Sequence, residues 1–147
     1  MLFRSDGVAL REIAGGCVCC AAQTQLRVGL TQLLRTAKPD RLLIEPSGLG
    51  HPAGVIDALR DPWLASAVEL RAVLCIADIR QFLDPRSAAV DTYRDQVALA
   101  DVLVGSKADL ASDAERADFR ARAADLYPRK AAVVESVRGR RSEEHTS

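Results

Sequence analysis

The sequence predicts an α/β fold in which a mostly parallel sheet is flanked by helices in a doubly wound arrangement. Short, continuous apolar runs, which are typical of strands buried on both faces, alternate with longer segments of helical periodicity. This alternation favours parallel strands joined by helical crossovers. The four apolar runs are residues 41–45 (RLLIE), 72–78 (AVLCIAD), 101–106 (DVLVGS) and 130–136 (KAAVVES).

Helices are expected before and between these strands. The apolar face of the first helix consists of Leu26, Leu30, Leu33 and Leu34, which recur at helical spacing. Pro39 follows that helix and ends it. Residues 87–100 are expected to form a second helix and residues 112–127 a third, which opens with Ser112 or Asp113 as its cap.

The two ends of the chain have a different character. Residues 1–16 hold two short apolar stretches around an Asp6-Gly7 turn signal, which predicts a hairpin. Residues 138–147 are expected to be a disordered tail, because the closing RSEEHTS has no apolar periodicity. We interpret that heptapeptide as read-through of a sequencing adapter, which leaves residues 1–137 as the folded part.

Composition excludes several function classes. Lys plus Arg and Asp plus Glu number 20 each, so no net positive charge is present to hold a nucleic acid. No apolar run approaches the ~20 residues of a membrane-spanning helix, and the N-terminus lacks the apolar region of a signal peptide. We therefore expect a cytoplasmic protein with neither nucleic acid nor membrane as a partner.

The segment LLIEPSGLGHP, residues 42–52, is the first candidate binding loop. An apolar strand that ends in an acid and is followed by glycine is typical of a phosphate-sensing loop. Glu45 is an oxygen donor suited to Mg²⁺, and the Gly48 amide could approach a γ-phosphate because no side chain blocks it. The alternative is a Pro/Gly turn in which Glu45 is merely solvated.

The segment VGSKADL, residues 104–110, is the second candidate. Lys-x-Asp after an apolar strand is similar to the guanine-reading motif Asn-Lys-x-Asp. Asp109 would accept two hydrogen bonds from guanine, and the Lys107 stem would lie over the base. Ser106 replaces the usual Asn and offers fewer hydrogen bonds, so weaker base affinity is expected. The alternative is a charged turn that caps the next helix.

Three cysteines, Cys17, Cys19 and Cys20, crowd the segment GGCVCC. Their thiolates could fill three positions of a tetrahedral Zn²⁺ site or a trigonal Cu(I) site, because thiolate is a soft ligand. A redox dithiol and free buried thiols are the alternatives. Cys75, within an apolar run, is expected to be a small core residue. His51 could ligate a metal, contact phosphate or lie exposed in its loop.

Together and in this order, GGCVCC, IEPSGLGHP and SKADL resemble the CobW family of metal-chaperone GTPases, over roughly residues 5–136. The resemblance implies a partial P-loop GTPase domain that binds GTP with Mg²⁺, hydrolyses it, and delivers zinc or another transition metal to an unidentified client metalloprotein. The residues it implies are the metal ligands Cys17, Cys19 and Cys20, the catalytic Glu45 and Gly48 with Ser47 beside them, and the guanine-binding Ser106, Lys107 and Asp109.

One part of the family pattern is missing from these residues. No GxxxxGK[ST] loop occurs, although that loop supplies most of the phosphate-binding energy. The family keeps it one strand upstream of position 1, and its C-terminal domain is also missing, so we interpret the chain as an internal piece of a GTPase. The competing hypothesis is a metal-binding or thiol-redox α/β module that hydrolyses no nucleotide.

The missing loop generates a first prediction. The isolated 147-residue chain is expected to bind GTP weakly or not at all, because the amides and lysine that hold the phosphates are missing. The longer parent is expected to bind and hydrolyse GTP. Calorimetric titration of GTP into the isolated chain checks this, and tight binding would contradict it.

Overall fold

The computed structural model describes residues 2–5, 8–12, 20–46 and 52–141. The chain divides into two compact units, Met1–Leu70 and Arg71–Ser147, which are called unit 1 and unit 2. Among the helices of the described residues, none is both long and apolar enough to cross a membrane.

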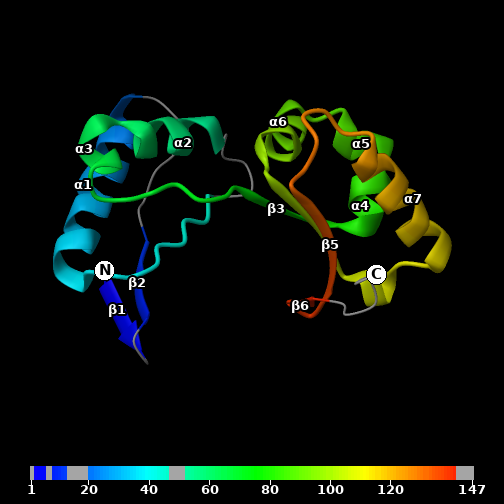
Figure 1. Ribbon diagram of the computed structural model, residues 1–147, viewed down its shortest axis with the longest axis horizontal. Helices are drawn as coiled ribbons and strands as arrows, with labels where there is room; N and C mark the ends of the chain where they lie inside the picture. The colour runs from blue at the N-terminus through cyan, green and yellow to red at the C-terminus, as the bar shows by residue number, and fades with distance from the viewer. Residues whose placement is uncertain (1, 6–7, 13–19, 47–51, 142–147) are drawn as a thin grey trace. The chain divides into compact units, whose positions relative to one another are not determined.

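Unit 1 begins with a hairpin and continues with helices (Figure 1). Strands β1 (Leu2–Ser5) and β2 (Val8–Arg11) pair antiparallel, which confirms the predicted hairpin. The helices are α1 (Cys20–Ala37), α2 (Pro52–Arg60) and α3 (Pro62–Ala65). Helix α1 is the predicted leucine-rich helix, and it ends shortly before Pro39 as expected.

The core of unit 1 lies where α1, α2 and α3 meet. Leu30, Leu59 and Leu64 are buried there, one from each helix. Leu42 and Ile44 pack against the same cluster from the connecting segment. An ion pair between Arg27 of α1 and Asp61, the N-cap of α3, adds a polar link at the surface.

The predicted strand at residues 41–45 is wrong for the described structure. Residues 41–46 form neither helix nor strand. Their side chains do alternate as in a strand, because Leu42 and Ile44 face the core while Leu43 is 86% exposed. A strand also needs a hydrogen-bonded neighbour, and none is assigned to this segment among the described residues.

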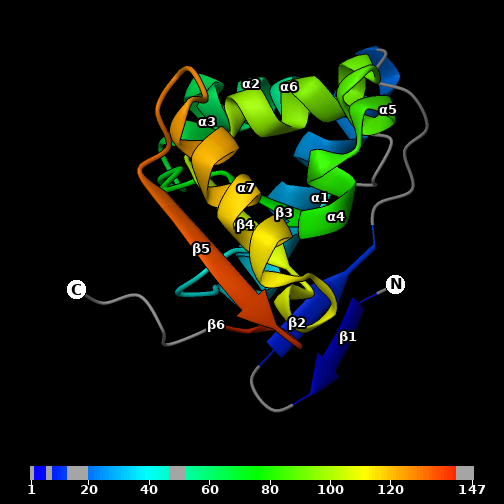
Figure 2. The same ribbon diagram turned by 90° about the vertical axis from the view of Figure 1, so that its right-hand side faces the viewer.

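Unit 2 contains the main sheet, in the order β3-β4-β5-β6 (Figure 2). Strands β3, β4 and β5 run parallel, and the short β6 is antiparallel to β5, so the mostly parallel sheet is confirmed. The strands are β3 (Leu74–Asp78), β4 (Val102–Ser106), β5 (Ala132–Val137) and β6 (Arg140–Arg141). The helices are α4 (Ile79–Leu83), α5 (Pro85–Ala88), α6 (Asp91–Leu99), the 3₁₀ turn η1 (Ala108–Leu110) and α7 (Asp113–Ala124).

Two expectations about unit 2 change. The helix expected over 87–100 is divided into α5 and α6, separated at Val90. Residues 138–141, expected in a disordered tail, instead form a turn and β6, whose Arg140 and Arg141 pair with the end of β5. The remaining residues of that tail, 142–147, lie outside the described residues.

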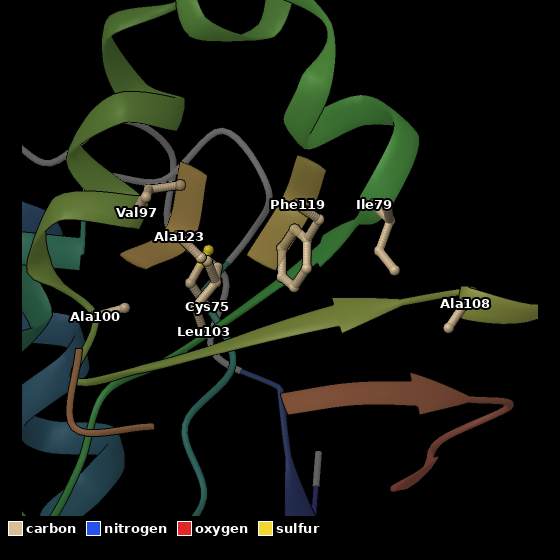
Figure 3. Close-up of a cluster of buried hydrophobic side chains, with 8 residues drawn as sticks. All are labelled: Cys75, Ile79, Val97, Ala100, Leu103, Ala108, Phe119 and Ala123. Carbon is tan, nitrogen blue, oxygen red and sulfur yellow. The ribbon is translucent and has the colours of Figure 1, made fainter. Parts of the chain in front are cut away.

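The helices of unit 2 pack on one face of the sheet. The buried cluster joins Cys75 of β3 and Leu103 of β4 to side chains from α4, α6 and α7 (Figure 3). The helix residues are Ile79, Val97, Phe119 and Ala123. On the alternate positions of β3, Leu74 and Ile76 are 58% and 69% exposed, so β3 is buried on one face rather than on both as its apolar run predicted.

Gly105 is the point of closest approach between β4 and the helices. A Cβ at this position would lie 2.7 Å from Cε1 of Phe119 and 2.9 Å from Cγ1 of Ile79. Both side chains are fully buried, and the Phe119 ring packs edge-on against Phe82 with centroids 5.1 Å apart. The absence of a side chain at Gly105 therefore allows α4 and α7 to lie close to the central strand.

This packing predicts that Gly105→Ala destabilises the chain by about 1–3 kcal/mol, since the added methyl group overfills a closed core. Urea unfolding gives the change in free energy. The double variant Gly105→Ala/Phe119→Leu is the control, because a smaller side chain at position 119 makes room for the methyl. Unchanged stability in Gly105→Ala would show that the core can relax without cost.

Candidate functional site at the carboxyl ends of β3 and β4

Polar residues gather where β3 and β4 end. The parallel register places Asp78, the last residue of β3, beside Ser106, the last residue of β4. Lys107 follows directly, and Asp109 lies in η1. The carboxyl ends of parallel strands are where α/β proteins bind ligands. The structure therefore brings the three predicted guanine-binding residues to one edge of the sheet.

Asp78 is the centre of this group. Its Oδ2 lies 3.2 Å from Nζ of Lys107 and 2.9 Å from Nη2 of Arg80. Its Oδ1 accepts from the backbone N–H of Arg80 at 3.0 Å, which caps α4. Hydrogen bonds from the Arg80 side chain, aided by its backbone N–H and by Lys107, lower the pKa of Asp78 to about 2 despite partial burial.

The sequence analysis did not single out Asp78. The signal was present, because AVLCIAD is an apolar run that ends in an acid, as RLLIE does. Only the parallel register between β3 and β4 shows that this acid lies beside the Ser-Lys-x-Asp segment.

The backbone of Lys107 adopts the left-handed conformation, with φ 56° and ψ 39°. This conformation is uncommon for a residue with a side chain. A 3₁₀ turn holds it, in which the Leu110 N–H donates to the Lys107 carbonyl at 2.9 Å, and Ala108 is buried beneath the turn. Lys107 and Asp109 both remain exposed, so their polar groups are accessible to a ligand.

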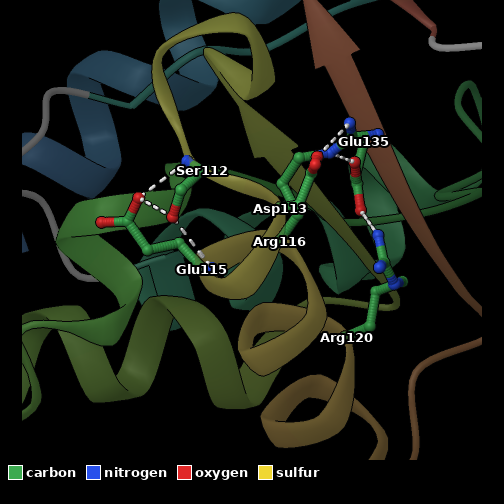
Figure 4. Close-up of polar contacts among 6 residues, drawn as sticks. All are labelled: Ser112, Asp113, Glu115, Arg116, Arg120 and Glu135. Carbon is green, nitrogen blue, oxygen red and sulfur yellow. Dashed lines mark hydrogen bonds and ion pairs between the residues drawn. The ribbon is translucent and has the colours of Figure 1, made fainter.

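Helix α7 begins directly after this segment and is anchored at its N-terminus (Figure 4). Ser112 and Glu115 form a capping box, in which the Glu115 N–H donates to Ser112 Oγ at 3.3 Å. In return, the Ser112 N–H donates to Glu115 Oε2 at 2.8 Å. The predicted cap at Ser112 is confirmed, and it sets where the turn with Lys107 and Asp109 must end.

A buried carboxylate ties α7 to β5. Glu135 accepts from Arg116 Nε at 2.6 Å and from Arg120 Nη1 at 2.5 Å, and its side chain is 5% exposed (Figure 4). Burial alone would raise the pKa of Glu135, but the hydrogen bonds from the two arginines outweigh it and hold that pKa below its usual value. A buried carboxylate with two cationic partners is stable as an anion.

The other predicted nucleotide residues are only partly described. Glu45 is exposed, in the extended segment that follows α1. Its carboxylate is an oxygen donor that fits Mg²⁺ in chemistry. Ser47, Gly48 and His51 lie outside the described residues, so their roles stay predictions.

The predicted metal ligands fall at the start of α1. Cys17 and Cys19 lie outside the described residues, and Cys20 is the first residue of α1, one position before the start expected from the sequence. Within the described residues, no group of three or more His, Cys, Asp and Glu side chains could hold a metal ion. Cys75 is buried in β3 as predicted, and burial raises the pKa of its thiol.

Comparison with known families identifies this arrangement. The family profile described as "CobW/HypB/UreG, nucleotide-binding domain" matches residues 1–134, which is most of the chain. The chain belongs to the CobW/HypB/UreG family. Both the predicted family and the α/β fold class are thereby confirmed.

Curated relatives within the CobW/HypB/UreG family carry names of zinc chaperones. "Zinc chaperone YeiR" of Escherichia coli is 50% identical over 108 residues, covering 74% of this chain and 33% of that protein. "Zinc chaperone CobW" of Pseudomonas aeruginosa is 30% identical over 150 residues, covering 87% of this chain and 40% of that protein. "Zinc-regulated GTPase metalloprotein activator 1" of Dictyostelium discoideum is 27% identical, covering 71% of this chain and 27% of that protein.

This chain therefore spans between about a third and two fifths of the length of its first two relatives. No solved structure matches it.

The ion pairs of Asp78 predict a pH dependence. Because the pKa of Asp78 falls from its ordinary 3.8 to about 2 on folding, the carboxylate stabilises the fold fully above its unfolded pKa, and this stability is lost as pH falls toward 2. Urea unfolding at several pH values should show the wild-type chain more stable than Asp78→Asn at neutral pH. The margin should narrow between about pH 4 and pH 2. A margin independent of pH would contradict this prediction.

Proposed function

We propose that this chain is the nucleotide- and metal-binding part of a GTP-dependent zinc chaperone, which couples GTP hydrolysis to binding and delivery of zinc or another transition metal. The observation that carries the proposal is the placement of Ser106, Lys107 and Asp109 at the carboxyl end of β4, in a chain that belongs to the CobW/HypB/UreG family. The names of its relatives as zinc chaperones support the metal cargo.

Guanine recognition is assigned to the turn after β4. The Asp109 carboxylate is exposed and would accept hydrogen bonds from N1 and the exocyclic amine of guanine. Adenine presents no such pair of donors, so this contact selects guanine. The Lys107 stem would cover the base, and the Ser106 hydroxyl would contribute one hydrogen bond.

Phosphate chemistry is assigned to the segment that follows residues 41–44. Glu45 would bind Mg²⁺, which neutralises charge on the phosphates when bound. Ser47 and the Gly48 amide would contact the γ-phosphate, and water would then replace the bond between the γ-phosphorus and GDP. The P-loop that completes this site is expected in a longer polypeptide that contains these residues, where the reaction takes place.

Metal cargo is assigned to the thiols before and at the start of α1. Cys20 opens an 18-residue helix, whose N-terminus favours a thiolate over a thiol. With Cys17 and Cys19 it would supply three soft ligands and leave the fourth position of a tetrahedral Zn²⁺ site open. An open position suits transfer to a client metalloprotein. We infer a cytoplasmic setting, because these thiols must stay reduced.

The proposal predicts zinc binding by the chain itself. Titration under reducing conditions, with a chromophoric chelator as competitor, should give one zinc per chain with an affinity tighter than about 1 μM, a typical outcome for thiolate sites. The triple variant Cys17→Ser/Cys19→Ser/Cys20→Ser should bind none. Cys75→Ala is the matched control, because Cys75 is buried in β3 and its removal should leave zinc binding unchanged.

Two results would overturn the assignment of the metal site. Zinc binding by the triple variant as tight as that of the wild type would place the site elsewhere. No zinc binding by the wild type, with a disulfide forming readily among the three cysteines, would favour the thiol-redox hypothesis.

A further inference from the structure

Asp78 makes two kinds of contact that lie side by side. With Arg80 it forms a local unit, in which Arg80 donates to it from the backbone N–H at 3.0 Å, from Nε at 3.2 Å and from Nη2 at 2.9 Å. With Lys107 it forms a non-local ion pair at 3.2 Å, across the β3–β4 register. The Asp78 side chain is 13% exposed, while that of Lys107 is 59% exposed.

Lys107 is thereby held at both of its ends. Its backbone is in the left-handed conformation, at φ 56°, and the buried Ala108 follows it in the turn. Its ammonium group is tethered to Asp78. A lysine side chain has four rotatable bonds and large conformational entropy, and fixing both ends removes much of that freedom before any ligand arrives.

We propose that Asp78 is a positioning residue for guanine recognition, holding the Lys107 side chain where its stem can lie over the base. The inference rests on the proposed function, since it assigns the base to Lys107 and Asp109. Asp78 itself touches no part of the nucleotide and acts through Lys107. Preorganising a ligand-binding side chain strengthens binding, because less freedom is lost when the ligand binds.

The chain contains a matched control for this proposal. Asp84 caps α5 and binds Arg86 in the same local pattern, with the Arg86 backbone N–H donating at 2.9 Å and Arg86 Nη2 lying 2.7 Å from Oδ2. The contacts described for Asp84 include no lysine. Comparing Asp78 with Asp84 therefore separates the ion pair with Lys107 from capping and from pairing with arginine.

The test is a double-mutant cycle in the full-length polypeptide that includes the expected P-loop. Fluorescent GDP and ADP analogues are titrated into the wild type, Asp78→Asn, Asp84→Asn, Lys107→Met and Asp78→Asn/Lys107→Met. Asp78→Asn is expected to weaken GDP binding by about fivefold, and Asp84→Asn by less than about twofold. In the Lys107→Met background, Asp78→Asn should have an effect of less than about twofold, because its lysine partner is gone.

Thermal unfolding checks that each variant is folded, and Asn retains a capping oxygen at position 78. If Asp78→Asn fails to fold, Asp78→Ser, which also caps without a charge, takes its place. The inference is overturned if Asp78→Asn binds GDP as Asp84→Asn does, or if its loss persists undiminished beside Lys107→Met. A wild type that binds GDP no better than ADP overturns the proposed function instead, which distinguishes the two failures.

Discussion

The close approach of Phe119 and Ile79 to Gly105 is the contact on which unit 2 depends. It lets α4 and α7 press against the central strand β4, with no side chain at position 105 to hold them away. Once the two helices are seated, their N-termini are set as well. The N-terminus of α4 determines where Asp78 lies, and that of α7 determines where the turn with Lys107 and Asp109 ends. The candidate base-binding site is therefore a consequence of core packing.

Two carboxylates in unit 2 are each paired with two cations, but their surroundings differ. Glu135 is 5% exposed, and its partner Arg116 is 19% exposed, so this cluster joins α7 to β5 away from solvent. The partners of Asp78, Arg80 and Lys107, are 45% and 59% exposed. The first arrangement suits a structural tie, while the second leaves cationic side chains ordered and accessible to a ligand.

Local patterns in the sequence predicted much of the fold. The leucine spacing of α1, the hairpin of β1 and β2, and the cap at Ser112 depend on neighbours within a few residues, and each is present as predicted. The segment 41–45 failed because an apolar run specifies burial, whereas a strand also requires a partner along its edge. The turn into β6 was missed because polar residues after a strand can still form a short antiparallel pair.

The sequence by itself determined the family and the order of the motifs, since Cys-x-Cys-Cys, Glu-x-Ser-Gly and Ser-Lys-x-Asp are each contiguous and can be recognised without a fold. Tertiary structure alone decided which residue supports the guanine-reading turn. Asp78 and Lys107 belong to segments separated by three helices and a strand, and they meet because β3 and β4 pair in parallel with Asp78 beside Ser106. Strand register is a long-range property, so no local pattern could reveal that contact.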